Sequence, residues 1–187
     1  MIKIIDNFLE STEARMVEKC LVDCPWFLTF DEATVSSFKY LTMKDSNTKE
    51  YIQFVHNLLD NNGILLSPNY TFLINFFQNK LKDIQTIKKF MRMKINLQTQ
   101  CSFSKEHFYN TPHLDRLDNL EYFNAIYYVN ESDGETLLFK KENNKYEIIE
   151  KVFPKKGRLL IFDGNIYHSG RHPIEALKRI IINFNFI

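Results

Sequence analysis

The stretch Thr111-Pro112-His113-Leu114-Asp115 decides how this sequence is interpreted. His113 and Asp115 are separated by one residue, so on an extended segment both side chains lie on the same face. An imidazole and a carboxylate in this arrangement can bind one metal ion. Because the chain has five His and 23 Asp plus Glu, the pair alone is weak evidence for a metal site. Its weight comes from the residues that follow it.

An ordered series of short segments follows the pair. The series consists of a strand-like run at residues 122–129, Gly134-Glu135-Thr136, Gly157-Arg158 with an apolar run to Phe162, then His168, and Arg179 at the start of a last apolar run. If the fold brings His168 to the pair, two imidazoles and one carboxylate can bind the same metal ion. Such a set leaves coordination positions open, which suits non-haem Fe(II) chemistry.

Composition indicates a globular protein and gives no indication of a nucleic-acid or membrane partner. The 187 residues favour one domain, residues 1–187, and 44% apolar residues with 17 Phe are enough for a core. The 24 Lys plus Arg nearly balance the 23 Asp plus Glu, so there is no nucleic-acid or membrane signal. Three cysteines without metal-site spacing fit a reducing compartment. With neither a signal peptide nor a membrane span expected, we expect a cytoplasmic protein.

The first part of the chain shows mainly helical signals, and we assign residues 1–90 to a helical support region. Short strands are expected at residues 2–5 and 27–30. Three helices are expected: one that is capped by Ser11 and ends before Pro25, one over about residues 48–59 that stops at Asn62-Gly63, and one that follows Ser67-Pro68.

From residue 90 onward the periodicity changes to that of strands. In residues 91–100, Met93, Ile95 and Leu97 share one face, and Arg92, Lys94 and Asn96 share the other. Strands are also expected at 123–129, 158–162, 166–168 and 179–186, with a hairpin formed by 136–141 and 145–152. Closely spaced short strands favour an antiparallel sandwich or barrel over βαβ units.

Arg179 opens an apolar strand, where an unpaired guanidinium would be costly. We interpret it as an internal cation that pairs with an acidic group inside the barrel, because arginine can bind a carboxylate bidentately. The alternative is a surface arginine at the strand entry. Lys178 should point to the opposite face, whereas Asn183 and Asn185 share the face of Arg179 and require partners there.

Other polar residues are weaker candidates for a site. His107, Asp118 and Glu121 are expected on a loop surface, and His172 is expected to be exposed in a turn before Pro173. His56 is expected at the surface or at the edge of the core, within the second helix.

As a set, these motifs resemble the Fe(II)- and 2-oxoglutarate-dependent dioxygenases, especially their prolyl-4-hydroxylase-like branch. The resemblance covers residues 90–187, with a weaker echo at residues 4–9. The family fold is a double-stranded β-helix, a jelly-roll barrel backed by N-terminal helices. The resemblance therefore implies an α+β, mainly β chain whose jelly-roll core is residues 91–187.

The resemblance also implies roles for single residues. His113, Asp115 and His168 match the iron ligands of the family. Arg179 matches the residue that binds the distal carboxylate of 2-oxoglutarate, and Tyr128 matches a tyrosine that contacts the same carboxylate in hypoxia-type prolyl hydroxylases. Whether Tyr127 or Tyr128 faces the cosubstrate stays open at this point.

Two positions depart from the family pattern. Asp133 stands before Gly134 where the family usually has a second glycine. Phe103 replaces a tyrosine often found upstream of the first metal-binding histidine, so that contact is either absent or supplied elsewhere, with Asn96 as the candidate. Asn183 completes the predicted cosubstrate site. These departures leave iron binding intact and weaken the case for a prolyl-peptide substrate.

The implied activity is hydroxylation of a primary substrate by dioxygen, while 2-oxoglutarate is converted to succinate and CO2. Fe(II) and 2-oxoglutarate are the implied cofactor and cosubstrate, with ascorbate as a supporting reductant. The primary substrate, a prolyl peptide or a small molecule, stays open. One alternative is a non-catalytic jelly roll that binds a metal or small acid. A cupin-type dioxygenase or an isomerase would need a third His or a Glu. Neither alternative explains Arg179 after His168.

Overall fold

The part of the chain that the structure describes forms two antiparallel sheets and two α-helices. The computed structural model of the protein describes residues 1–29, 52–101, 109–116, 120–142 and 145–187. The seven-stranded major sheet has the order β1-β8-β5-β10-β4-β3-β2, and the three-stranded minor sheet has the order β7-β6-β9. The elements are β1 (Ile2–Ile5), α1 (Ser11–Cys20), β2 (Phe27–Thr29), β3 (Gln53–Leu59), the 3-10 helix η1 (Pro68–Tyr70), α2 (Thr71–Lys82), β4 (Phe90–Thr99), β5 (Phe123–Tyr128), β6 (Thr136–Glu142), β7 (Lys145–Val152), β8 (Leu159–Asp163), β9 (Tyr167–Gly170) and β10 (Lys178–Phe186).

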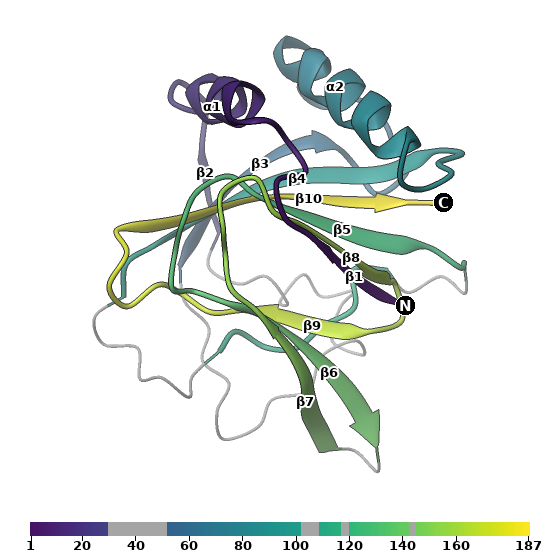
Figure 1. The fold of residues 1–187 in the computed structure, drawn as a ribbon, viewed down its shortest axis with the longest axis vertical. Helices are drawn as coiled ribbons and strands as arrows, with labels where there is room; N and C mark the ends of the chain where they lie inside the picture. Colours follow the sequence, from purple (N-terminus) through teal and green to yellow (C-terminus); the bar gives the residue numbers. More distant parts are fainter. Residues whose placement is uncertain (30–51, 102–108, 117–119, 143–144) are drawn as a thin grey trace.

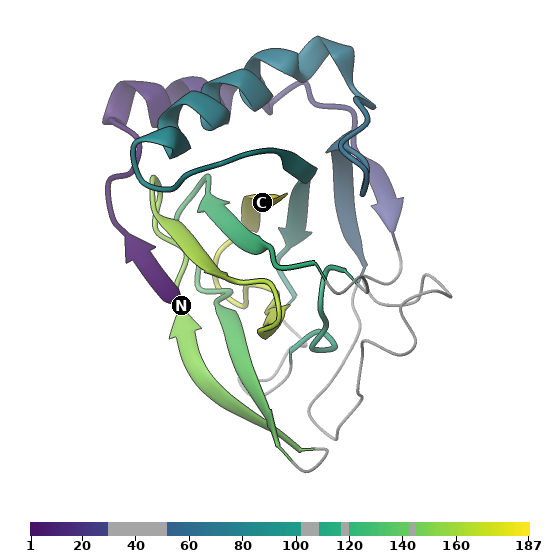
Figure 2. The same ribbon diagram turned by 90° about the vertical axis from the view of Figure 1, so that its right-hand side faces the viewer.

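The elements stack in three layers (Figure 1). Both helices cover one face of the major sheet, and the minor sheet lies against the other face, as the turned view in Figure 2 also shows. Two antiparallel sheets packed face to face in this way form the expected jelly-roll barrel. Among the described residues, no helix is both long and apolar enough to cross a membrane.

Alternation along the strands of the major sheet places separate apolar clusters on its two faces. The cluster under the helices includes Tyr127, whose ring lies 5.1 Å from that of Phe77 on α2. The cluster between the sheets includes Tyr128 with Leu138 of β6 and Val152 of β7. The two adjacent tyrosines therefore serve different layers, and Tyr128 is the one inside the barrel.

Polar side chains line the barrel interior along the two central strands of the major sheet. In the β10–β4 register, Arg179 lies opposite Gln98, and Asn185 lies opposite Arg92. The apolar residues between them, such as Ile182, face the helices and pack in the other cluster. The alternation seen in the sequence therefore places a polar row inside the barrel, where it can only persist with hydrogen-bond partners.

The helix expected over residues 48–59 is wrong for the part that the structure describes. Residues 53–59 form β3, which pairs with β4 and β2. A short apolar run can satisfy either period, and here the edge of β4 supplies the hydrogen bonds of a strand. Asn62-Gly63 belongs to the turn after this strand, where Gly63 has φ 79° and the Asp60 carboxylate accepts the amide N–H of Asn62 at 2.8 Å.

The other expected elements are confirmed with small shifts. The first helix begins at Ser11, but the residue at its N-cap is Glu10, which forms a capping box with Glu13. The third helix follows Ser67-Pro68 after the short η1 turn. The hairpin strands β6 and β7 pair as expected, while residues 30–51 and the hairpin tip at 143–144 lie outside the described residues.

Candidate metal centre

Backbone pairing brings the two histidines together. The amide N–H of each donates to the carbonyl of the other at 3.0 Å, which makes an isolated antiparallel bridge between His113 and His168. His168 belongs to β9 and also pairs with Leu138 of β6. The segment that carries His113 therefore extends the minor sheet by one short strand-like contact, which holds the two imidazoles with their ring centroids 4.7 Å apart.

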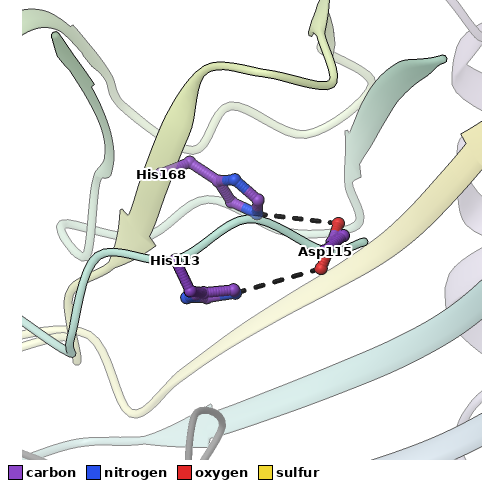
Figure 3. Close-up of side chains that lie close together, drawn as sticks. All are labelled: His113, Asp115 and His168. Atoms are coloured by element: carbon purple, nitrogen blue, oxygen red, sulfur yellow. Dashed lines mark ion pairs between the residues drawn. The ribbon is translucent and has the colours of Figure 1, made fainter. Parts of the chain in front are cut away.

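Asp115 completes a buried cluster of three potential ligands (Figure 3). The Nε2 atom of His113 lies 3.9 Å from Oδ1 of Asp115, and that of His168 lies 3.7 Å from Oδ2. One ligand atom from each residue lies within 4.8 Å of the others, which is close enough for one metal ion. The two-His, one-carboxylate donor set fits Fe(II).

A hydrogen bond prepares His113 as a ligand. Its Nδ1 lies 3.0 Å from the carbonyl oxygen of Thr111, an acceptor that requires an N–H donor. The neutral tautomer with the proton on Nδ1 then carries its lone pair on Nε2, the atom that faces Asp115. Metal-binding histidines are usually oriented in this way by a carbonyl or carboxylate.

Donors surround the Asp115 carboxylate. Arg92 donates from Nη1 to Oδ1 at 2.7 Å, and Asn185 and Asn183 donate from Nδ2 to Oδ2 at 2.9 and 3.2 Å. Burial opposes ionisation of Asp115, but Arg92 and the two neighbouring imidazoles outweigh it and hold its pKa well below the ordinary value. The carboxylate is therefore charged at neutral pH, as a metal ligand must be.

Arg179 lies in the same pocket as the two imidazoles. Its Nη1 donates to Oε1 of Gln98 and its Nη2 to Oγ1 of Thr136, both at 2.7 Å. The Tyr128 hydroxyl donates to Thr136 at 2.8 Å, and burial raises the pKa of Tyr128 to about 12, so it stays protonated. These bonds fix a buried cation at one end of the pocket, where it can meet a carboxylate.

Two glycines make room for this arginine. A Cβ atom at Gly134 would lie 2.4 Å from the carbonyl oxygen of Arg171 and 3.1 Å from Cδ of Arg179. A Cβ at Gly170 would lie 3.3 Å from Nη1 of Arg179. Preceding Gly134, Asp133 accepts the backbone N–H groups of residues 174–176 at 2.8 to 3.0 Å, which gives the departure from a second glycine a structural role.

The predicted site residues lie together in the barrel, although two contacts differ in detail. Asn96 lines the pocket and donates to Gln53 at 3.4 Å, while Gln98 is the residue bonded to Arg179. Asn183 lines the pocket and donates to Asp115. The bonds described for Arg179 go to neutral oxygens rather than to the expected acidic group.

Sequence reasoning missed Arg92 and Gln98 as site residues, and it placed Asn185 inside the barrel without identifying Asp115 as its partner. The strand alternation that puts Arg92 and Asn96 on the same face indicated that Arg92 could face the barrel interior. It does not indicate which side chains reach Asp115. His172, expected to be exposed, is buried with Nδ1 3.1 Å from the carbonyl oxygen of Thr99.

The remaining candidates have mixed outcomes. Glu121 is exposed, as expected. His56 is not in a helix but lies buried on β3, with Nδ1 2.8 Å from the carbonyl oxygen of Pro25 and Nε2 2.8 Å from Oγ of Ser67. The positions of Phe103, His107 and Asp118 lie outside the described residues.

Solved structures with the same fold are numerous. An oxidoreductase of the 2OG-Fe(II) oxygenase family from Burkholderia pseudomallei is 14% identical, with a TM-score of 0.69 over 99% of this chain and 84% of that chain. A prolyl-4-hydroxylase from Pseudomonas putida is also 14% identical, with a TM-score of 0.55 over 99% and 91%. HygX from Streptomyces hygroscopicus, solved with nickel and 2-oxoglutarate bound, is 12% identical, with a TM-score of 0.57 over 99% and 82%.

At these identities the structural likeness shows the fold alone. A comparison with curated proteins finds no match. The sequence itself matches the family model of the 2OG-Fe(II) oxygenase superfamily over residues 97–187. This matched segment carries His113, Asp115, His168 and Arg179, so all four candidate site residues lie in the part of the chain that is similar to the 2OG-Fe(II) oxygenase superfamily.

Proposed function

We propose that this protein is an Fe(II)- and 2-oxoglutarate-dependent dioxygenase that hydroxylates an organic substrate and releases succinate and CO2. The observation that carries the proposal is one pocket lined both by the two candidate metal-binding imidazoles and by the buried Arg179. A dicarboxylate with a 2-keto group needs this combination: a metal for the keto acid and a cation for the distal carboxylate.

Each residue has a distinct task in this proposal. His113, Asp115 and His168 would hold the iron, and the open coordination positions would accept cosubstrate and dioxygen. When bound, iron supplies the oxygen activation that couples 2-oxoglutarate decarboxylation to hydroxylation. Arg179 would bind the distal carboxylate, supported by Tyr128 through Thr136.

The apolar walls of the pocket serve the same chemistry. Ile126 and Ile181 line it together with the polar residues. Their side chains restrict water around the bound acid, which strengthens the electrostatic contact to Arg179. The neighbour from Pseudomonas putida is a prolyl-4-hydroxylase, and that from Streptomyces hygroscopicus was solved with 2-oxoglutarate. These neighbours share the fold, and the family match over residues 97–187 supports the reaction class, whereas the primary substrate of this protein is a separate question.

Metal and cosubstrate binding tests the proposal. The purified protein should bind one equivalent of Mn(II), used anaerobically as an inert substitute for Fe(II), and should bind 2-oxoglutarate much more tightly with the metal than without it. Asp115→Ala and His168→Ala should remain folded and lose stoichiometric metal. Glu121→Ala removes an exposed carboxylate close in sequence and should bind metal as the wild type does. If the Asp115 and His168 variants still bind one metal tightly, the ligand assignment is wrong.

A further inference from the structure

Arg92 lies where a cation is not expected, beside a carboxylate that should bind a metal cation. Its Nη1 is 2.7 Å from Oδ1 of Asp115, and the pair is largely buried, with 16% of the Arg92 side chain and 3% of the Asp115 side chain exposed. Arg92 is on β4, on the strand face that looks into the barrel. The contact is therefore a buried ion pair at the metal centre, not a surface contact.

The number of hydrogen bonds to Asp115 limits how it can bind a metal. An ionised carboxylate offers about four acceptor positions. Among the described residues, Arg92 uses one position on Oδ1, and Asn183 and Asn185 use two on Oδ2. One position, on Oδ1, is left for a metal ion, so Asp115 can bind as a monodentate ligand while it keeps all three donors.

Whichever way the metal enters, Arg92 opposes it. If Arg92 keeps its bond to Oδ1, its positive charge repels a divalent cation bound to the same carboxylate. If Arg92 leaves, a buried ion pair must be broken, which is costly. In the protein without metal, by contrast, Arg92 balances the buried charge of Asp115. Both routes give the same sign, so Arg92 stabilises the metal-free protein more than the metal-bound protein.

We propose that Arg92 is a built-in counter-ion of Asp115, which lets the chain fold before metal arrives and weakens metal binding in exchange. This inference rests on the metal site of the proposed function. Thermodynamic linkage turns it into a measurable statement: a substitution that destabilises the metal-free state more than the metal-bound state must tighten metal binding. An ordinary residue of the outer shell does the reverse, because its loss typically weakens metal binding about 10- to 100-fold.

Arg92→Gln removes the positive charge and keeps a polar side chain with hydrogen-bond donors at this position. We expect its dissociation constant for Mn(II), measured anaerobically by titration, to fall on the order of tenfold. The melting temperature of the metal-free variant should be below that of the wild type, and saturating Mn(II) should recover most of the difference. Arg92→Lys keeps the charge and should bind Mn(II) within about threefold of the wild type.

Arg158→Gln is the matched control, because it breaks another Arg–Asp pair, between Nε of Arg158 and Oδ1 of Asp6 at 2.6 Å, away from the metal centre. It should leave the Mn(II) dissociation constant unchanged. An unchanged or raised constant in Arg92→Gln, or a loss of stability that Mn(II) does not recover, overturns the counter-ion proposal while the metal site stands. A wild-type protein that binds no Mn(II) overturns the metal site and this inference together.

Discussion

Replacing Arg179 by alanine should uncouple cosubstrate binding from metal binding. Arg179 is 2% exposed, and its guanidinium donates to Gln98 and Thr136, each at 2.7 Å. A hydrogen bond to a charged group contributes about 1.5–3 kcal/mol. Arg179→Ala should therefore raise the dissociation constant of 2-oxoglutarate roughly ten- to a hundredfold.

The assay is an anaerobic calorimetric titration of 2-oxoglutarate into protein saturated with Mn(II). Lys178→Ala is the matched control, since Lys178 precedes Arg179 on β10 but is exposed, on the other face of the strand. The control should bind 2-oxoglutarate as the wild type does, and Mn(II) affinity should change little in either variant. Equal 2-oxoglutarate affinity in Arg179→Ala and wild type would refute the assignment of the carboxylate anchor.

Two further substitutions test how the fold supports the site. Phe77→Ala removes a fully buried ring on the inner face of α2 and should lower the free energy of unfolding by about 3–5 kcal/mol in a denaturant titration. Because Phe77 packs on the helix side of the sheet, the affinity for Mn(II) should stay the same. A Cβ at Gly134 would displace Arg171 or Arg179. Gly134→Ala should therefore weaken 2-oxoglutarate binding by about tenfold and leave Mn(II) binding intact. An equal loss of 2-oxoglutarate and Mn(II) affinity would indicate general misfolding instead.

Much of the site could be predicted because its residues follow strand rules. His113 and Asp115 share a face of an extended segment, and Arg179 and Asn183 share a face of β10, which the structure also shows. These relations depend only on the local period of two residues. The order of the candidate ligands along the chain also sufficed to suggest that they meet.

The sequence predictions that failed concern residues whose conformation or partners are set by contacts between distant segments. Residues 53–59 have no decisive period, and their strand conformation follows from pairing with β4. The bond from Arg92 to Asp115 depends on where the segment that carries Asp115 lies against the sheet, which no local pattern gives. His172 precedes Pro173 in a turn, yet that turn is buried against Thr99. In each case tertiary packing overrides the local signal.

The central claim is that this protein uses dioxygen to oxidise 2-oxoglutarate, and the origin of an oxygen atom in succinate tests it directly. Loss of the first carboxylate as CO2 converts the keto carbon into a carboxylate, which needs one new oxygen atom. With Fe(II), ascorbate, 2-oxoglutarate and ¹⁸O-labelled dioxygen but no primary substrate, we expect slow formation of succinate that carries one labelled oxygen, detected by mass spectrometry. His168→Ala should form none. Succinate no higher than the His168→Ala background, in protein shown to hold both metal and 2-oxoglutarate, would contradict the account and favour a binding module with the same barrel.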